Sequence, residues 1–197
     1  MKNCRNVLEI SPAFIAFLCA YYYFDPGQTF FPFLISVLLH EAGHLLALWP
    51  CGAKIRKLKL EALGASMITE PLSWGREFLA AAAGPLVNLL LFLLTLRKFP
   101  PFSMVNLCLL CFNLLPVFPL DGGRMLRALL SLFLTDRQVY LSEQIIGGLF
   151  FLLFLWGAVW LTCCCHAGLW PILTFGLLFL RIAWAQGEER RIFRLGS

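Results

Sequence analysis

Two histidines and a glutamate lie within five residues of one another in the otherwise apolar segment 37–48. On an α-helix, His40 and His44 share one face, because side chains four residues apart are stacked. Their imidazole nitrogens could bind one Zn²⁺, and Glu41 is placed to act as a general base on a water held by that ion. The residue types and their spacing therefore predict a hydrolytic metal site.

A catalytic zinc ion usually has three protein ligands and one open position. The only other histidine is His166, which the charge distribution places on the opposite membrane surface. Asp121 ends a long apolar stretch and precedes Gly122-Gly123, so by itself it would be a turn residue or a helix cap. Because two histidines lack a third partner, we predict that Asp121 is the third ligand.

The elements that must position these residues belong in a membrane. The chain has 197 residues, of which 60% are hydrophobic and 14% charged, and its mean hydropathy is +0.79. No charged residue occurs in 78–96, 99–120 or 144–180. Since a soluble domain has about 25% charged residues, these values exclude a soluble enzyme, a secreted disulfide-rich domain and a nucleic-acid-binding protein.

The predicted fold class is an all-α polytopic membrane protein, with residues 1–197 forming one integral membrane domain and no soluble regulatory domain. Six spans are predicted, at about residues 10–24, 30–49, 78–96, 101–119, 144–162 and 169–184. The first span has no small-residue cleavage site and is predicted to be an anchor. Fourteen of the 16 basic residues fall on one side, which predicts both termini and the metal site at the cytoplasmic face.

The longest connection includes a stretch with a strand pattern. Residues 57–62 alternate polar and apolar side chains, Gly64 interrupts the alternation, and 65–69 could return as a second strand. A β-hairpin at the membrane surface is the simpler interpretation. The alternative is an edge strand that pairs with an extended substrate peptide, in which Leu58 and Leu60 would contact the substrate.

Charges inside membrane helices are informative because each costs about 2.5–3.5 kcal/mol to insert. Glu41 lies within the second predicted span and Asp121 at the end of the fourth, whereas the other acidic residues are assigned to loops.

Of the eight cysteines, three consecutive ones at 163–165 precede His166 and could bind a metal. Packing at the bilayer surface is favoured, because consecutive residues rarely point at one ion.

Three segments together resemble one known family, the site-2 proteases, which are intramembrane zinc metalloproteases. Residues 40–44 resemble its zinc-binding helix, 83–88 its middle core helix, and 113–124 the segment whose aspartate completes the zinc site. The resemblance implies a Zn²⁺ cofactor, and implies that Asn113 and Asn88 bind the substrate backbone or the developing oxyanion. The residues alone leave a helix-bridging role open for both asparagines.

Within this family, the third segment is most similar to the sporulation proteases that process pro-sigma-K. That similarity implies a bacterial cytoplasmic membrane location and a protein substrate with a transmembrane or membrane-associated segment, such as a pro-sigma factor. The lipid bilayer and an inhibitory membrane partner are implied as further partners, and no nucleic acid. One departure is that no CBS domain follows the last predicted span.

A divalent-metal transporter or a metal sensor with the same ligands is the alternative function. That alternative gives Glu41 no role. The polar groups within the predicted spans also lie at one depth and do not trace a path across the bilayer.

Overall fold

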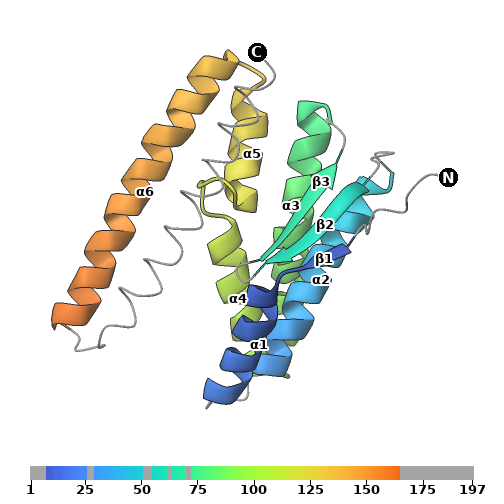
Figure 1. Cartoon of the computed structure of the whole chain (residues 1–197), viewed down its shortest axis with the longest axis vertical. Helices are drawn as coiled ribbons and strands as arrows, with labels where there is room; N and C mark the ends of the chain where they lie inside the picture. The colour runs from blue at the N-terminus through green and yellow to red at the C-terminus, as the bar shows by residue number, and fades with distance from the viewer. Residues whose placement is uncertain (1–7, 26–28, 51–54, 62–63, 70–71, 165–197) are drawn as a thin grey trace. The chain divides into compact units, whose positions relative to one another are not determined.

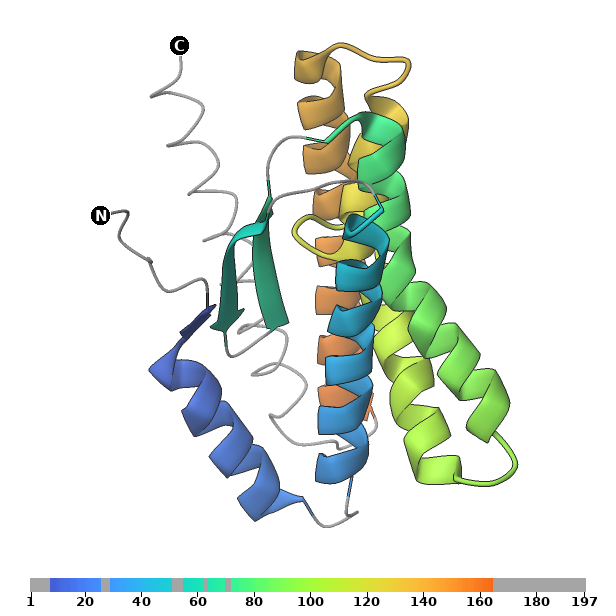
Figure 2. The same ribbon diagram turned by 90° about the vertical axis from the view of Figure 1, so that its right-hand side faces the viewer.

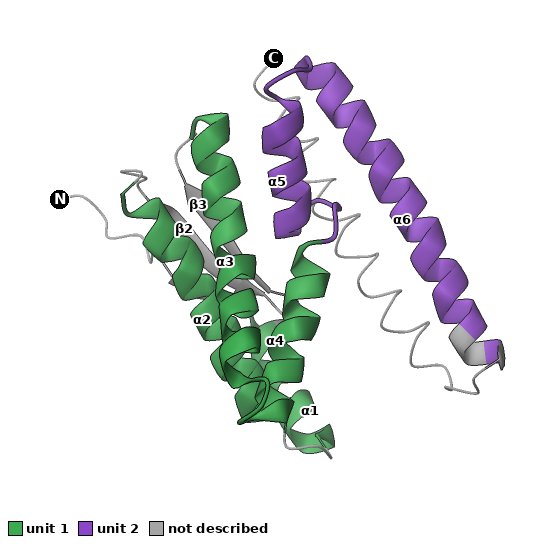
Figure 3. Cartoon of the chain, turned by 180° about the vertical axis from the view of Figure 1, so that it is seen from behind, with its two compact units in different colours: residues 1–114 green, residues 115–197 purple. Residues whose placement is uncertain are grey.

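The computed structural model describes residues 8–25, 29–50, 55–61, 64–69 and 72–164 (Figure 1). Two compact units are distinguished, Met1–Leu114 and Leu115–Ser197 (Figure 3). The elements of the first unit are β1 (Leu8–Ile10), α1 (Pro12–Phe24), α2 (Phe30–Leu48), β2 (Ile55–Glu61), β3 (Gly64–Thr69), α3 (Trp74–Thr95) and α4 (Pro100–Asn113). Those of the second unit are α5 (Asp121–Leu130) and α6 (Asp136–Cys164).

Three of these helices are long and apolar enough to cross a membrane: α2, α3 and the Asp136–Trp160 part of α6. Shorter apolar helices cover Phe14–Phe24 and Pro100–Asn113. The chain is thus mainly helical and has the apolar helices of a membrane protein. The sixth predicted span, 169–184, lies outside the described residues.

The fourth predicted span differs most from the structure, because α4 ends at Asn113 and not near residue 119. Pro116 and Pro119 follow within six residues. Proline has no amide hydrogen and disfavours helical geometry in the residue before it, so an apolar stretch containing two prolines does not continue as a helix. After this turn the chain forms α5, which the sequence reading does not predict.

Helices α2, α3 and α4 pack against one another and form the core of the first unit (Figures 1 and 2). Small residues allow α2 and α3 to approach closely. A Cβ at Gly43 would lie 2.8 Å from Cγ2 of Val87 and 3.0 Å from the carbonyl oxygen of Ala83. On the α3 side, Ala80 and Ala81 are buried. Close approach through small residues is typical of helix pairs in membranes, and here it brings α3 up to the histidine face of α2.

The strands form one sheet in the order β1-β2-β3, in which β1 is parallel and β3 antiparallel to β2. Leu58 of β2 is paired with Leu8 on one side and with Met67 on the other. This order corrects one expectation, since β2 is the middle strand and cannot offer an edge to a peptide. The side chains of Leu58 and Leu60 lie outside the described residues.

The second unit begins with a tight turn that leads into α5. The amide of Leu120 donates to the carbonyl of Val117 (2.9 Å), and the amide of Arg124 donates to the carbonyl of Leu120 (3.0 Å). A Cβ at Gly123 would lie 2.7 Å from the carbonyl oxygen of Val117. Because that obstacle is backbone, only glycine fits at this position, and the turn can fold closely against the first turn of α5.

Candidate metal centre

The two histidines of α2 are buried, and each residue is 5% exposed. Nδ1 of His44 lies 2.7 Å from the carbonyl oxygen of Ala80 on α3. A carbonyl can only accept a hydrogen bond, so Nδ1 carries the proton and Nε2 of His44 keeps its lone pair. A histidine that binds a metal through one ring nitrogen usually donates a hydrogen bond from the other, and this bond fixes the tautomer.

Gly84 of α3 lies directly against both rings. A Cβ at this position would be 2.6 Å from Cε1 of His40 and 2.6 Å from Cε1 of His44. Any other residue would therefore displace the imidazoles. The sequence includes Gly84 in a segment that resembles the family, but its contact with the histidines depends on helix packing that the sequence does not show.

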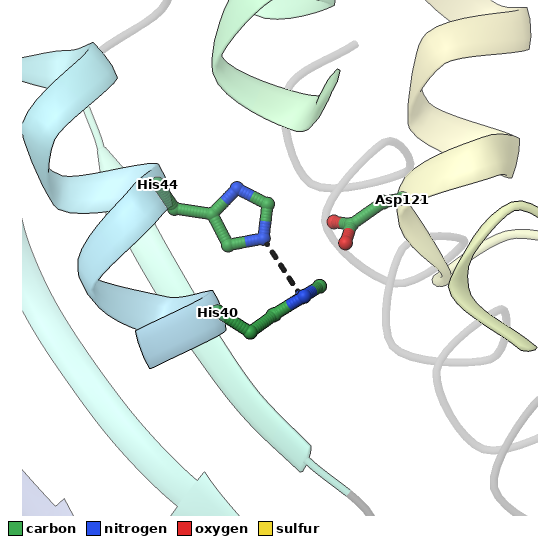
Figure 4. Close-up of side chains that lie close together, drawn as sticks. All are labelled: His40, His44 and Asp121. Atoms are coloured by element: carbon green, nitrogen blue, oxygen red, sulfur yellow. Dashed lines mark hydrogen bonds between the residues drawn. The ribbon is translucent and has the colours of Figure 1, made fainter. Parts of the chain in front are cut away.

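The Nε2 atoms of His40 and His44 lie 3.1 Å apart (Figure 4). Two nitrogens bound to one tetrahedral zinc ion, each about 2.0–2.1 Å from it, are separated by roughly 3.3 Å. With Asp121, the histidines form a buried group in which one ligand atom from each residue lies within 4.8 Å of the others (Figure 4). Two imidazoles and one carboxylate are the donor set of a catalytic zinc site that keeps one position open, so these residues fit the ion.

The structure places the remaining predicted site residues in different surroundings. Glu41 is half-buried on α2, next to His40. Asn113 is the last residue of α4 and its Nδ2 donates to the carbonyl of Leu109 (3.1 Å), which uses one of its two amide hydrogens. Asn88 is completely buried within α3, and among the described residues its Oδ1 and Nδ2 have no hydrogen-bond partner.

One buried acid is absent from the sequence-based candidates. Glu143 of α6 is 8% exposed and forms an ion pair with Arg127 of α5. The sequence places Glu143 in a loop, because the fifth span is predicted to begin at residue 144. Its position next to the charge-free run 144–180 is the one signal that could have drawn attention to it.

Peptidase family M50 matches residues 97–155, which include Asp121 and Glu143. The fold is similar to a solved site-2 protease from Methanocaldococcus jannaschii, with a TM-score of 0.68 and 26% identity, covering 90% of this chain and 89% of that chain. The chain is thus similar to the site-2 proteases, over part of its sequence and in its fold. The resemblance noted from the three sequence segments is thereby confirmed.

Proteins similar to this chain include a zinc metalloprotease of Methanocaldococcus jannaschii, 36% identical over 110 residues, which are 49% of this chain and 32% of that protein. Stage IV sporulation protein FB of Bacillus subtilis is 33% identical over 113 residues, which are 50% of this chain and 38% of that protein. The chain spans about a third of the length of these curated relatives.

Proposed function

We propose that this chain is a site-2 protease that hydrolyses a peptide bond of a membrane-embedded or membrane-associated protein, with Zn²⁺ held by His40, His44 and Asp121. The observation that carries the proposal is the buried group of these three side chains, with Glu41 adjacent to His40 on the same helix. Zinc bound there would polarise the scissile carbonyl and lower the pKa of a coordinated water to about 7.

The chain's own residues supply the remaining chemistry. Glu41 takes a proton from the attacking water and later gives it to the leaving amine. The carbonyl of Ala80 keeps the His44 ring in one tautomer and orientation. Asn113 has one amide hydrogen besides the one it donates to Leu109, and we assign that hydrogen to the substrate backbone or the developing oxyanion.

A helical substrate must be unwound before attack, because its peptide groups are hydrogen-bonded to one another. We propose that the substrate is held extended against the sheet at the membrane surface. Since β2 is the middle strand, the pairing edge is assigned to β3 (Gly64–Thr69). Main-chain hydrogen bonds of this kind bind a peptide with little dependence on its sequence.

We further propose that residues 1–197 form a single membrane domain with six spans in the bacterial cytoplasmic membrane. Both termini and the metal site are assigned to the cytoplasmic side, because fourteen of the 16 basic residues fall on that side. A pro-sigma factor is the first substrate to test, given the similarity to Stage IV sporulation protein FB. An inhibitory membrane partner would be sought by co-purification.

The decisive variant is Glu41→Gln, which removes the proton acceptor and leaves the ligands intact. Purified wild-type protein is expected to hold about one zinc per chain and to cleave a co-expressed single-span or pro-sigma substrate. The variant is expected to hold the same zinc and to release no product. Unchanged cleavage by Glu41→Gln would exclude this mechanism.

The same variant separates the protease from a metal transporter. A transporter with these ligands would move zinc across liposomes, and would still do so with Glu41→Gln, because transport needs no general base. The proposed protease gives no such flux. Flux that persists in the variant, together with no cleavage by the wild type, would favour the transporter.

A further inference from the structure

The second unit contains an ion pair between the buried Glu143 and the partly exposed Arg127. Nε of Arg127 donates to Oε1 of Glu143 at 2.7 Å, and a terminal guanidinium nitrogen donates to Oε2 at 2.8 Å. Two parallel bonds between a guanidinium and a carboxylate fix both the separation and the relative orientation of the groups. The pair therefore joins α5 to α6 in one geometry.

The same guanidinium also lies over the ring of Phe118, 4.2 Å from its centroid. Phe118 belongs to the turn that precedes α5, and Asp121 follows it by three residues. Arg127 lies on α5, the helix that begins at Asp121. It contacts both the turn before Asp121 and helix α6. Gly123, in the first turn of α5, packs against the backbone of Val117 and Phe118.

Stability alone does not account for this pair. Removing two charges from water costs free energy, and a buried ion pair can often be replaced by apolar side chains without loss of stability. Arg124, the other arginine of α5, lies 3.6 Å from the Asp121 carboxylate itself, whereas Arg127 contacts Glu143 and the ring of Phe118. What the Arg127 pair adds is a fixed orientation of the turn and the start of α5.

We propose that Arg127 and Glu143 are positioning residues, which hold the turn at 114–120 and the first turn of α5 so that the Asp121 carboxylate keeps the orientation needed for metal binding. This inference rests on the proposed role of Asp121 as a zinc ligand. Neither residue is one of the three proposed zinc ligands. Partners that orient a ligand typically change metal affinity by about 10–100-fold when they are removed.

The first test is Arg127→Lys, which keeps the positive charge but cannot form two parallel bonds or stack as a plane on Phe118. Zinc affinity would be measured by competition with a chelator in detergent, and ligand geometry by the visible absorption of the cobalt-substituted protein. We expect the zinc dissociation constant to rise about 10-fold or more and the cobalt spectrum to change. Arg137→Lys, at an exposed position of α6, is the matched control and should change neither.

A second variant separates positioning from stability. Arg127→Met with Glu143→Leu replaces the pair by apolar side chains of similar size, and should keep the wild-type unfolding temperature. The proposal predicts that this double variant still binds zinc more weakly than the wild type. It can be used even where Arg127→Lys fails to fold.

The possible results distinguish the two levels of the proposal. Wild-type zinc affinity in a stable double variant, or in Arg127→Lys, would overturn the positioning role while leaving the metalloprotease intact. A wild-type protein that binds no zinc would overturn the proposed function first, whatever the variants do.

Discussion

At the scale of single residues, the metal site depends on atoms that the sequence pattern does not contain. The spacing of His40 and His44 is sufficient to predict that they share a helix face. The carbonyl of Ala80 that fixes the His44 tautomer belongs to another helix, and no sequence motif records a backbone acceptor. The ligand types were therefore predictable from the sequence, and their orientation was not.

Gly84→Ala is the sharpest test of that orientation. The new methyl group would lie 2.6 Å from Cε1 of both His40 and His44, so the rings or α3 must move. We expect weaker zinc binding and a loss of about 1–3 kcal/mol in unfolding free energy, as for other overpacked sites. Chelator competition and thermal unfolding measure the two effects.

The control for this variant is Gly148→Ala on α6, where a Cβ would meet no atom within 4 Å. That substitution should leave zinc affinity unchanged and stabilise the helix by up to about 1 kcal/mol. Equal zinc affinity in Gly84→Ala and wild type would show that the rings do not need this space.

Asp121→Asn tests the third ligand without changing its size. The amide keeps one oxygen but loses the negative charge that a zinc ligand of this kind supplies. We expect both zinc content after dialysis and substrate cleavage to fall, in contrast to Glu41→Gln, which loses cleavage alone. Metal analysis of the two variants prepared in parallel is the measurement, and full zinc retention by Asp121→Asn would assign the third ligand elsewhere.

At the scale of elements, the prediction is most accurate where hydropathy decides. The predicted span 30–49 corresponds to α2 (Phe30–Leu48), because a stretch of mostly apolar residues of this length leaves few alternatives. The end of α4 and the whole of α5 were missed, since hydropathy does not register Pro116 and Pro119 as the end of a helix. The order of the sheet was beyond the sequence as well, because the pairing of β1 with β2 joins segments about fifty residues apart.

Proline substitutions in β3 test the proposed pairing edge. In an antiparallel strand, amide hydrogens at adjacent residues point in opposite directions, so one of Ser66 and Met67 donates toward β2 and the other toward the open edge. Proline at the second position removes only the bond available to a substrate. We expect one of Ser66→Pro and Met67→Pro to keep zinc and stability yet cleave more slowly. Wild-type cleavage rates in both would exclude pairing at this edge.

At the scale of the whole molecule, composition predicts more than any single motif. Sixteen basic and 11 acidic residues in 197 leave long stretches without charge, and these stretches fix the class of protein before any site is considered. These stretches do not fix where each helix begins and ends, because the hydrocarbon thickness sets only a minimum span length. The helix α6 shows this, since it begins at Asp136, eight residues before the charge-free run.

The proposed orientation predicts that the connections at Lys98 and at Arg137 lie on opposite sides of the membrane. Alkaline phosphatase, which is active only outside the cytoplasm, would be fused after Lys98 or after Arg137. We expect activity in the first fusion and none in the second, because Arg97 and Lys98 are the two basic residues assigned to the outer side. The reverse pattern would invert the topology and place the metal site at the outer face.

The glycine that faces the two imidazoles also has a genetic consequence. Gly84 follows His44 by forty positions, yet the residues at these positions depend on each other. Neither His40 nor His44 can be replaced by a smaller residue to make room for a side chain at position 84, because the replacement would remove a metal ligand. A damaging change at Gly84 therefore has no compensating change available at His40 or His44. When strains carrying Gly84→Ala are selected for restored proteolysis, the survivors should carry true reversions to glycine at position 84 and the original histidine codons.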